Sequence, residues 1–381
     1  MLNSFQHLIR FYKGIFMKNT FGNSVAVTIF GESHGEAVGA VIDGLAPGLS
    51  VNDEFIRSQL DKRRPQGTIS TARRESDPYS IVSGVFNGLT TGTPICILIP
   101  NENKHSSDYD ELRRTPRPSH ADWTAECKYH GYQDYRGGGH FSGRITASLV
   151  AAGAIVIDAL RSKGIIIGTH IAKLADVQDR HFSDYNEDIT RLNDMTFAVL
   201  DETAAAKMHT AAEKAAADGD SVGGVLETAI IGVPAGVGEP WFDTMESVLS
   251  HILFSVPAVK GVEFGGGFDM CSRRGSEVND SFCIDGDKIA TKTNFSGGIN
   301  GGITNGMPII FRCAVKPTPS IYKEQDSVDI LTKECKKLTI NGRHDPAIIH
   351  RARVVIDSIT AFVLADMLAL RYGTDWISQH D

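Results

Sequence analysis

The pattern of apolar and polar positions predicts both helices and strands. Apolar residues at helical spacing, often with capping residues before them and glycine after them, predict helices at 52–62, 145–163, 203–217, 243–255 and 350–371. Short runs rich in β-branched residues predict strands at 25–30, 81–86, 94–99, 165–169, 225–233 and 308–315. Because these elements do not alternate as regular βαβ units, we expect an α+β fold with antiparallel pairing.

The chain shows no proline- or serine-rich linker. We therefore expect one domain over residues 17–381, although 381 residues would on average suggest two or three domains. Residues 1–16 mix basic and apolar residues without a small-residue cleavage site, so we interpret them as a disordered or mis-assigned N-terminal extension, with Met17 as the start. The longest apolar run, Leu149–Ile157, is too short to span a membrane.

Composition excludes several classes of protein. A formal net charge of −8 argues against nucleic-acid binding. The six cysteines never form a CxxC pair, which argues against a zinc ribbon or a thioredoxin-like motif and fits a reducing cytoplasm. The 38 glycines are clustered, for example at 137–139 and 301–302, and such clusters predict close backbone approach or positive φ angles.

The segment Gly31-Glu32-Ser33-His34-Gly35 follows a predicted strand and fits the GxSxG nucleophile elbow of serine hydrolases. A helix follows that elbow, whereas the next residues here are typical of a strand and a turn, which disfavours a hydrolase with Ser33 as its nucleophile. Two other interpretations stay open. The loop either presents Ser33 and His34 to a ligand, or it is a solvated turn in which His34 has no role.

Arginine is concentrated in two segments of this acidic chain. Residues 57–74 contain six cations where a predicted helix ends, and residues 113–144 contain five arginines that bracket three histidines. Arginines of this kind can bind phosphate or carboxylate through paired hydrogen bonds. Arg144 also adjoins the start of the predicted buried helix, whose free N–H groups favour an anion. Cations at a helix end and an exposed glycine-rich turn are the structural alternatives.

Two later segments add polar groups to this set. Lys316–Ser320 combines a lysine and two hydroxyls on a proline-rigid loop, which suits a phosphate. Arg343 lies beside Asp345 before the last helix, where Asp345 could equally be a helix cap. The arginines, histidines and carboxylate together indicate proton transfer on a small, multiply anionic substrate. A non-catalytic anion-binding protein stays an alternative, and these residues by themselves do not identify a cofactor.

Three segments resemble the signatures of the chorismate synthase family. They are GESHGEAVGAVIDGLAPG (31–48), GHFSGRITASLVAAGAI (139–155) and GRHDPAIIHRARVVIDS (342–358), with RRPQG, RPSHAD, DYRGGG and KPTPS in the family's order. The resemblance covers about residues 18–371. It implies conversion of 5-enolpyruvylshikimate 3-phosphate, a phosphorylated dicarboxylate, to chorismate by a 1,4-elimination that requires reduced FMN. It also implies a cytoplasmic homotetramer with helices sandwiched between antiparallel sheets.

The resemblance implies roles for individual residues. His34 corresponds to the acid that assists the departing phosphate, His120 to the histidine that protonates or steadies the reduced flavin, and Asp345 to the carboxylate that removes a proton together with flavin N5. The implied FMN contacts are His140, Ser142, Pro257, Ala258, Gly301, Lys316, Pro317, Thr318, Pro319, Ser320 and Arg343. The implied substrate contacts are Ser33, Arg63, Arg64 and Arg144, and no metal is implied.

The chain departs from the family's pattern at several positions. His140 and Phe141 stand where many members have arginine and serine, Pro257 stands where asparagine is usual, and Asp357 where glutamate is common. The segment after Pro65 is one residue shorter and lacks a second arginine. No segment resembles an NADPH-binding domain, so we expect an external flavin reductase, with NADPH only as an indirect reductant.

Overall fold

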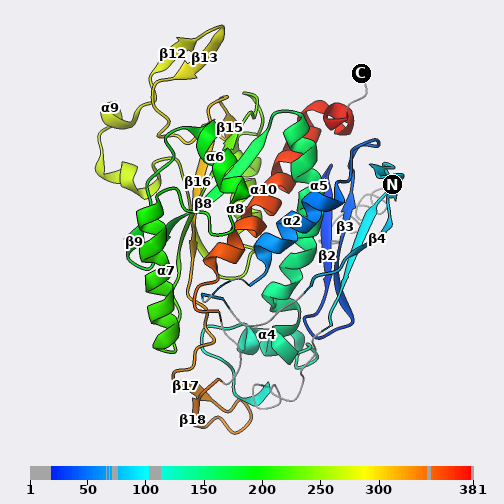
Figure 1. Cartoon of the computed structure of the whole chain (residues 1–381), viewed down its shortest axis with the longest axis vertical. Helices are drawn as coiled ribbons and strands as arrows, with labels where there is room; N and C mark the ends of the chain where they lie inside the picture. The colour runs from blue at the N-terminus through cyan, green and yellow to red at the C-terminus, as the bar shows by residue number, and fades with distance from the viewer. Residues whose placement is uncertain are drawn as a thin grey trace, which may run out of the picture.

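Two five-stranded sheets enclose a layer of helices (Figure 1). The structure is a computed structural model that describes residues 19–65, 67, 69–70, 76–102, 113–340 and 345–378. All strand pairs within the described residues are antiparallel. The predicted α+β fold with helices between antiparallel sheets is therefore confirmed. The predicted extension, residues 1–16, lies outside the described part of the chain.

The first sheet places the Ser33–His34 turn at one of its ends. Its strand order is β1-β2-β3-β7-β4. The strands are β1 (Thr20–Phe21), β2 (Ala26–Gly31), β3 (Ala37–Asp43), β4 (Ser80–Ser83) and β7 (Ile95–Pro100). β2 pairs with β3 from Ala26 opposite Asp43 to Gly31 opposite Val38, so the turn between them leaves the sheet where β7 also ends.

The second sheet carries the loops that follow β16 and precede β11. Its strand order is β11-β16-β10-β8-β9. The strands are β8 (Ile166–Leu174), β9 (Val177–Gln178), β10 (Gly224–Ile231), β11 (Val259–Phe264) and β16 (Ile309–Val315). Val315 pairs with both Gly224 and Val259, so the loop after β16 and the loop before β11 leave the same end of the sheet.

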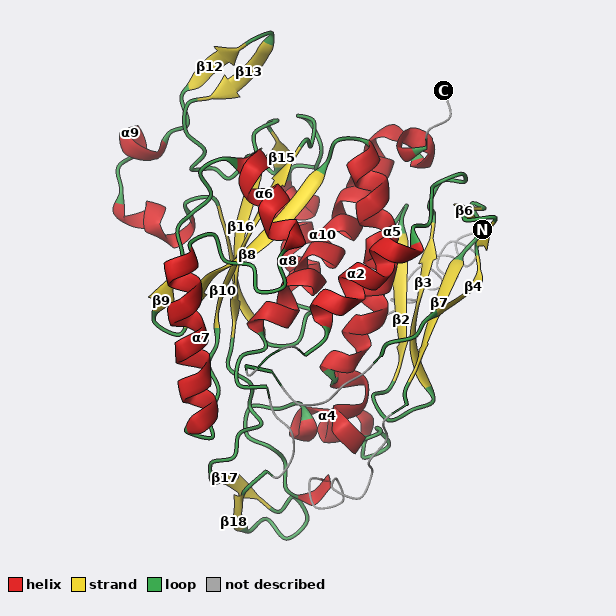
Figure 2. Cartoon of the chain, viewed as in Figure 1, coloured by secondary structure: helices red, strands yellow, loops and turns green. Residues whose placement is uncertain are grey.

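The helices fall into an inner and an outer group (Figure 2). The described α-helices are α2 (Asp53–Arg63), α4 (Asp122–Tyr129), α5 (Thr146–Ser162), α6 (Tyr185–Asp194), α7 (Glu202–Ala217), α8 (Met245–Leu253), α9 (Gly275–Val278) and α10 (Ile349–Tyr372). α2, α5, α8 and α10 lie between the sheets, whereas α6 and α7 pack on the outer face of the second sheet. α4 lies below the lower ends of the inner helices (Figure 1).

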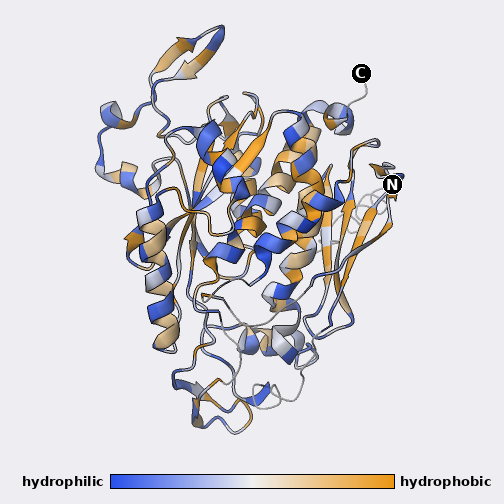
Figure 3. Ribbon diagram, viewed as in Figure 1, coloured by the Kyte–Doolittle hydropathy of each residue, from blue (hydrophilic) through white to orange (hydrophobic). Residues whose placement is uncertain are grey.

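One contiguous cluster of buried apolar side chains joins both sheets to the inner helices. Figure 3 shows the hydrophobic residues gathered along the strands of both sheets. This continuous core supports the expected single domain. Among the described residues, Gly143–Ser162 is apolar and long enough to cross a membrane, but 89% of its most apolar window is buried inside the protein, as in a core helix.

Short elements complete the fold. The two-stranded hairpins are β5 (Val85–Phe86) with β6 (Leu89–Thr90), β12 (Phe282–Asp285) with β13 (Lys288–Thr291), β14 (Ile299–Asn300) with β15 (Ile303–Thr304), and β17 (Gln325–Val328) with β18 (Cys335–Leu338). The 3-10 turns are η2 (Arg136–Phe141), η3 (Gly143–Ile145), η4 (Trp241–Asp243), η5 (Gly267–Ser272) and η6 (Thr374–Ile377).

The five predicted helices form, with small shifts at their ends. The start predicted at Asp243 is wrong because Asp243 ends a 3-10 turn and Thr244 is the cap, accepting from the N–H of Ser247 at 2.9 Å. With Thr244 as the cap, the third helical residue is Ser247 and not Glu246, so the expected capping box does not form.

α5 and α10 pack closely at one glycine. A Cβ atom added to Gly153 would lie 2.4 Å from the Cβ atom of Ser358 and 2.8 Å from its Cα atom. Gly153 does not have a positive φ angle, so space and not backbone conformation demands glycine here. The close approach lets two buried helices cross at the centre of the helix layer.

We expect Gly153→Ala to destabilise the protein by about 1–3 kcal/mol, because overpacking outweighs the gain of about 1 kcal/mol in helix propensity. The free energy of unfolding in urea measures the effect. Gly275→Ala is the matched control, since its added Cβ meets only Asn279, at 3.8 Å or more. Equal stabilities for the two variants would contradict the close-packing argument.

Candidate functional site

Ser33 and His34 are buried in the turn between β2 and β3, with 2% and 4% of their surfaces exposed. The Ser33 hydroxyl donates to the Arg136 carbonyl at 3.1 Å and lies 3.0 Å from His34 Nδ1, while the Ser33 N–H donates to the Gly139 carbonyl at 3.1 Å. Because the hydroxyl hydrogen points to Arg136, Ser33 Oγ accepts from His34 Nδ1–H. The solvated-turn interpretation is wrong. The following strand also excludes the nucleophile elbow of a hydrolase.

A glycine segment brings two predicted catalytic histidines together. Gly137, Gly138 and Gly139 have φ angles of 58°, 86° and 53°, a region that side chains rarely allow. A Cβ atom at Gly137 would lie 2.2 Å from His34 Cε1, and one at Gly138 would lie 3.3 Å from His120 Cε1. The two imidazoles therefore pack against adjacent residues of one turn, although 86 positions separate them in the sequence.

His120 is oriented by a carboxylate that stays ionised. Its Nδ1 lies 2.7 Å from Asp122 Oδ1, and Arg117 binds both oxygens of Asp122, at 2.7 and 2.8 Å. Burial alone would raise the pKa of Asp122, but hydrogen bonds from Arg117 and His120 hold it well below its usual range. Asp122 thereby fixes Nδ1 as the donor and turns the other edge of the ring toward Gly138.

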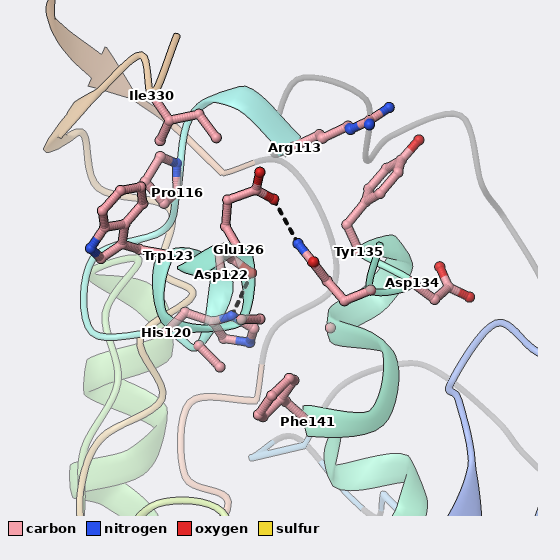
Figure 4. Close-up of a pocket in the computed structure, with 14 residues that line it drawn as sticks. Arg113, Pro116, His120, Asp122, Trp123, Glu126, Asp134, Tyr135, Phe141 and Ile330 are labelled. Carbon is pink, nitrogen blue, oxygen red and sulfur yellow. Dashed lines mark hydrogen bonds and ion pairs between the residues drawn. The ribbon is translucent and has the colours of Figure 1, made fainter. Parts of the chain in front are cut away.

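A pocket with aromatic walls opens beside His120 (Figure 4). Trp123, Tyr135 and Phe141 line it together with His120, and the guanidinium of Arg113 stacks on Tyr135 at 5.4 Å from the ring centroid. The side-chain oxygen of Gln133, another lining residue, is buried without a hydrogen-bond partner within the described structure. Flat apolar walls and a nearby cation suit a planar, negatively charged ring system, and the unsatisfied oxygen of Gln133 suits an N–H donor on the edge of such a ring.

The Lys316–Ser320 loop adjoins the same site. Lys316 Nζ donates to the carbonyl of Ser119 at 2.6 Å, and its backbone N–H donates to the carbonyl of Ala258 at 2.9 Å. Pro257, Ala258 and the lysine loop, all predicted FMN contacts, are thereby joined to the residue before His120. Thr318 Oγ1 is buried without a hydrogen-bond partner within the described residues, as expected of a group that binds a ligand.

Two further predicted FMN contacts, His140 and Ser142, follow the glycine segment directly, and their side chains bind different parts of the protein. The Ser142 hydroxyl accepts from the Arg144 N–H at 3.2 Å and caps η3, close to Gly138. His140 instead faces the first sheet: its Nδ1 lies 2.7 Å from the Gly31 carbonyl oxygen and its Nε2 lies 3.3 Å from Asn19 Oδ1. His140 therefore holds the end of β2 in this structure.

The structure does not bring every predicted contact together. Gly301 lies in the turn between β14 and β15, at the upper end of the molecule in Figure 1, whereas α4 and the adjoining site lie at the lower end. β16 separates Gly301 from Lys316 along the second sheet. Arg343 lies outside the described residues.

Arg63 and Arg144, the predicted substrate contacts, share one buried carboxylate. Arg63 ends α2 and donates to Asp77 Oδ2 at 3.3 Å, to Thr146 Oγ1 at 3.0 Å and to the Gly143 carbonyl at 2.8 Å. Arg144 binds Asp77 Oδ1. The side chain of Asp77 is fully buried, and 4–5% of each guanidinium side chain is exposed. One carboxylate therefore separates two buried cations.

The two arginines govern the charge of Asp77. Burial would raise its pKa, but the positive charges of Arg63 and Arg144 outweigh burial and lower it from the ordinary value. The group carries a net charge of about +1 and can still attract an anion. Arg64, also predicted as a substrate contact, points elsewhere, to Asp61 and the Ser76 carbonyl.

Asp345 is tied to this group through Arg351. Arg351 binds the Asp345 carboxylate and donates through Nε to the Arg63 carbonyl at 2.8 Å. Asp345 precedes α10, and its side chain is 12% exposed. The start of α10 therefore meets the end of α2 beside the two arginines.

Several residues that hold the site were not singled out from the sequence. They are Asp77, Asn101, Asp122 and Arg351. A carboxylate two residues after His120 is a local signal that could have identified Asp122. Asp77, Asn101 and Arg351 act on distant partners and gave no local signal.

We expect Asp77→Asn to lower the free energy of unfolding by about 3–5 kcal/mol near pH 7, because it leaves two buried guanidinium groups without a counter-charge. The folded-state pKa of Asp77 is lowered, so its stabilisation is full above about pH 4 and is lost as the pH falls through the folded-state value. Urea unfolding across a pH series should show a difference from the native chain that narrows below about pH 4.

Asp326→Asn is the control for this series, since the side chain is 87% exposed and its ion pair with Lys337 lies in solvent. It should change stability by less than about 0.5 kcal/mol at each pH. A loss for Asp77→Asn that stays constant between pH 7 and pH 3 would contradict the argument.

Comparisons with known proteins agree with one another. The family model for chorismate synthase matches residues 25–369. Chorismate synthases of Thermococcus gammatolerans and Methanobrevibacter smithii are 46% identical over 356 residues and 48% identical over 352 residues, covering 92% of this chain and 97% and 96% of the relatives. A crystal structure of chorismate synthase is similar with a TM-score of 0.73 and 27% identity, covering 93% of this chain and 94% of that one.

Chorismate synthases are lyases that release phosphate from 5-enolpyruvylshikimate 3-phosphate with reduced FMN, in aromatic amino acid biosynthesis. The match spans both sheets and the inner helices, and so includes the residues that surround His34 and His120. The chain belongs to the chorismate synthase family and catalyses this elimination.

Proposed function

We propose that His34, His120 and Asp345 handle the protons of the elimination. The observation that carries this proposal is the packing of the His34 and His120 imidazoles against adjacent glycines. His34 is the acid that assists the departing phosphate as the C–O bond breaks. Asp345 accepts the proton released when the C–H bond in the 1,4 relation breaks. Histidines suit such work because their ordinary pKa lies near neutrality.

Reduced FMN would lie beside His120 in this proposal, and when bound it supplies the electronic chemistry of the elimination. The aromatic walls support this placement, as do the Gln133 oxygen and the Thr318 hydroxyl, which have no hydrogen-bond partner in the described part of the chain. Ser142, Pro257, Ala258 and the Lys316–Ser320 loop would hold the cofactor, with His120 at its ring. His140 and Gly301 are left out of this set because their positions in the described chain point elsewhere.

The arginines would balance the negative charge of the substrate and the cofactor. The substrate carries a phosphate and two carboxylates, and each charge-assisted hydrogen bond contributes about 1.5–3 kcal/mol. Arg63 donates to Thr146, Gly143 and Asp77, and Arg144 donates to Asp77, Asn101 and Pro100. We therefore propose that both arginines act on the anionic substrate through the positive charge of this cluster.

We further propose a cytoplasmic homotetramer that receives reduced FMN from an external flavin reductase. Six free cysteines support a reducing compartment. Exposed aromatic side chains at Trp241, Phe242 and Phe282, with 74–88% of their surfaces exposed, support association between copies.

We expect His34→Ala and His120→Ala each to lower turnover at least ~100-fold, because each removes a proton donor or an oriented ring from the site. The assay is anaerobic, with chemically reduced FMN, and follows chorismate absorbance and phosphate release. His251→Ala, on the exposed side of α8, is the control and should leave turnover unchanged. Normal turnover with weaker binding alone would instead indicate a non-catalytic role for the two histidines.

We expect NADPH and oxidised FMN alone to give no chorismate under anaerobic conditions, because the proposal assigns flavin reduction to another protein. Dithionite-reduced FMN, or NADPH together with a purified flavin reductase, should restore product formation. Sustained turnover with NADPH alone would overturn the external-reductase proposal and leave the elimination chemistry untouched.

A further inference from the structure

Asn101 follows the last residue of β7, and its side chain forms hydrogen bonds in two directions. It is 8% exposed. Nδ2 donates to the carbonyls of Glu32 and Gly35, at 2.9 and 3.0 Å, and Oδ1 accepts from Arg144 Nε at 2.9 Å. The reversed amide would place its oxygen against two carbonyl oxygens, so these partners determine its orientation. The side chain therefore joins Arg144 to the turn after β2.

The turn that Asn101 binds carries His34. Glu32 and Gly35 bracket Ser33 and His34, and the Gly35 N–H also donates to the Glu32 carbonyl at 3.1 Å. The amide of Asn101 thus closes the turn from one side, while the glycine segment packs against it from the other. Its loss would remove the side-chain hydrogen bonds that hold the two residues on either side of Ser33 and His34.

A continuous set of contacts runs from the buried ion pair to this turn. Arg144 binds Asp77 through one terminal nitrogen, the Pro100 carbonyl through the other at 3.1 Å, and Asn101 through Nε. All three contacts are formed by a side chain with 5% of its surface exposed. The guanidinium of Arg144 and the His34 turn are therefore held by the same amide.

We propose that Asn101 is a positioning residue that sets the separation between the Arg144 guanidinium and the His34 imidazole. It holds the guanidinium whose positive charge attracts an anion of the substrate at a fixed distance from the acid that assists the departing phosphate. This inference rests on the proposed function, because it takes those roles for Arg144 and His34. A displacement of about 1 Å at a reacting group can lower a rate about 10²-fold, so the separation matters.

Asn101→Asp separates the two functions of the side chain. The carboxylate keeps an acceptor for Arg144 but sets an oxygen, in place of a donor, against the Glu32 and Gly35 carbonyls. We expect kcat to fall about 10²-fold because the acid moves, and KM to rise as well, because the new carboxylate cancels the net positive charge beside Arg144. FMN binding, followed by flavin fluorescence, should be retained.

The same substitution in a His34→Ala background tests whether Asn101 acts through His34. If it does, Asn101→Asp should lower kcat no further in that background, since the group it positions is absent. A merely structural role would instead lower kcat by the same factor in both backgrounds. All four proteins are assayed anaerobically with reduced FMN, and rates are normalised to folded protein.

Asn101→Ala is the second variant in case the aspartate prevents folding. Asn101→Ala introduces no repulsion. It should lower kcat in the native background but not in the His34→Ala background. It should also raise KM, because Arg144 loses a hydrogen-bond partner. Asn305→Asp is the matched control, since the Asn305 amide donates to another side chain at the far end of β16 and should leave both constants unchanged.

The outcomes distinguish the inference from the function on which it rests. Unchanged kcat for the foldable Asn101 variants, or an equal loss in both backgrounds, would overturn the positioning role alone. Unchanged kcat for His34→Ala by itself would overturn the acid role of His34, and this inference with it.

Discussion

Two guanidinium groups can be buried side by side in this protein because the Asp77 carboxylate lies between them. Their separate burial would cost several kcal/mol per charge. With the carboxylate in place, the group retains a net positive charge and fixes the end of α2 against the start of α5. Asp345 reaches the same point through Arg351, and the His34 turn reaches it through Asn101. The site is thus assembled around a buried charge cluster.

The glycine segment makes the second indispensable contribution. Gly137 and Gly138 lie in the turn before α5. Because they have no side chains, this turn can pack against the imidazoles of His34 and His120, which come from two different parts of the chain. The lysine loop adds a third part through the Ser119 carbonyl. No single element carries the chemistry, which agrees with a reaction in which the cofactor supplies the electronic step and the protein orients, neutralises and excludes water.

Local sequence signals predicted the parts of the fold that depend on local physics. Long apolar helices such as α5 and α10, and strands such as β16, were predicted because their burial imposes a pattern on neighbouring residues. β11 and the β12–β13 hairpin were missed, since a strand with several partly exposed positions carries little apolar signal.

The residues of the site likewise fall into those that the sequence could identify and those that it could not. The signatures identified Ser33, His34, His120 and Asp345; the structure packs Ser33, His34 and His120 against the glycine segment, and it ties Asp345 to the Arg63 end of α2 through Arg351. Asp77 and Asn101 could not be predicted, because their importance lies in partners tens of residues away. A lone aspartate or asparagine in a loop has the same sequence appearance whether it faces solvent or two buried cations. Arg63 and Arg144 show the opposite limit: their chemistry suggested anion contacts, and nothing in the sequence indicated that folding would direct so many of their donors to the protein.

α10 lies at the centre of the helix layer yet comes almost last in the chain, and it contacts α2, α5, α8, β8 and β10. During synthesis, the ribosome releases both sheets and the other inner helices before it releases α10. The nascent polypeptide must therefore leave the apolar surfaces that α10 covers exposed until α10 has been made, a state that favours aggregation or chaperone capture. Truncation near the carboxyl terminus would accordingly prevent maturation of the whole enzyme, and would not simply remove a peripheral helix.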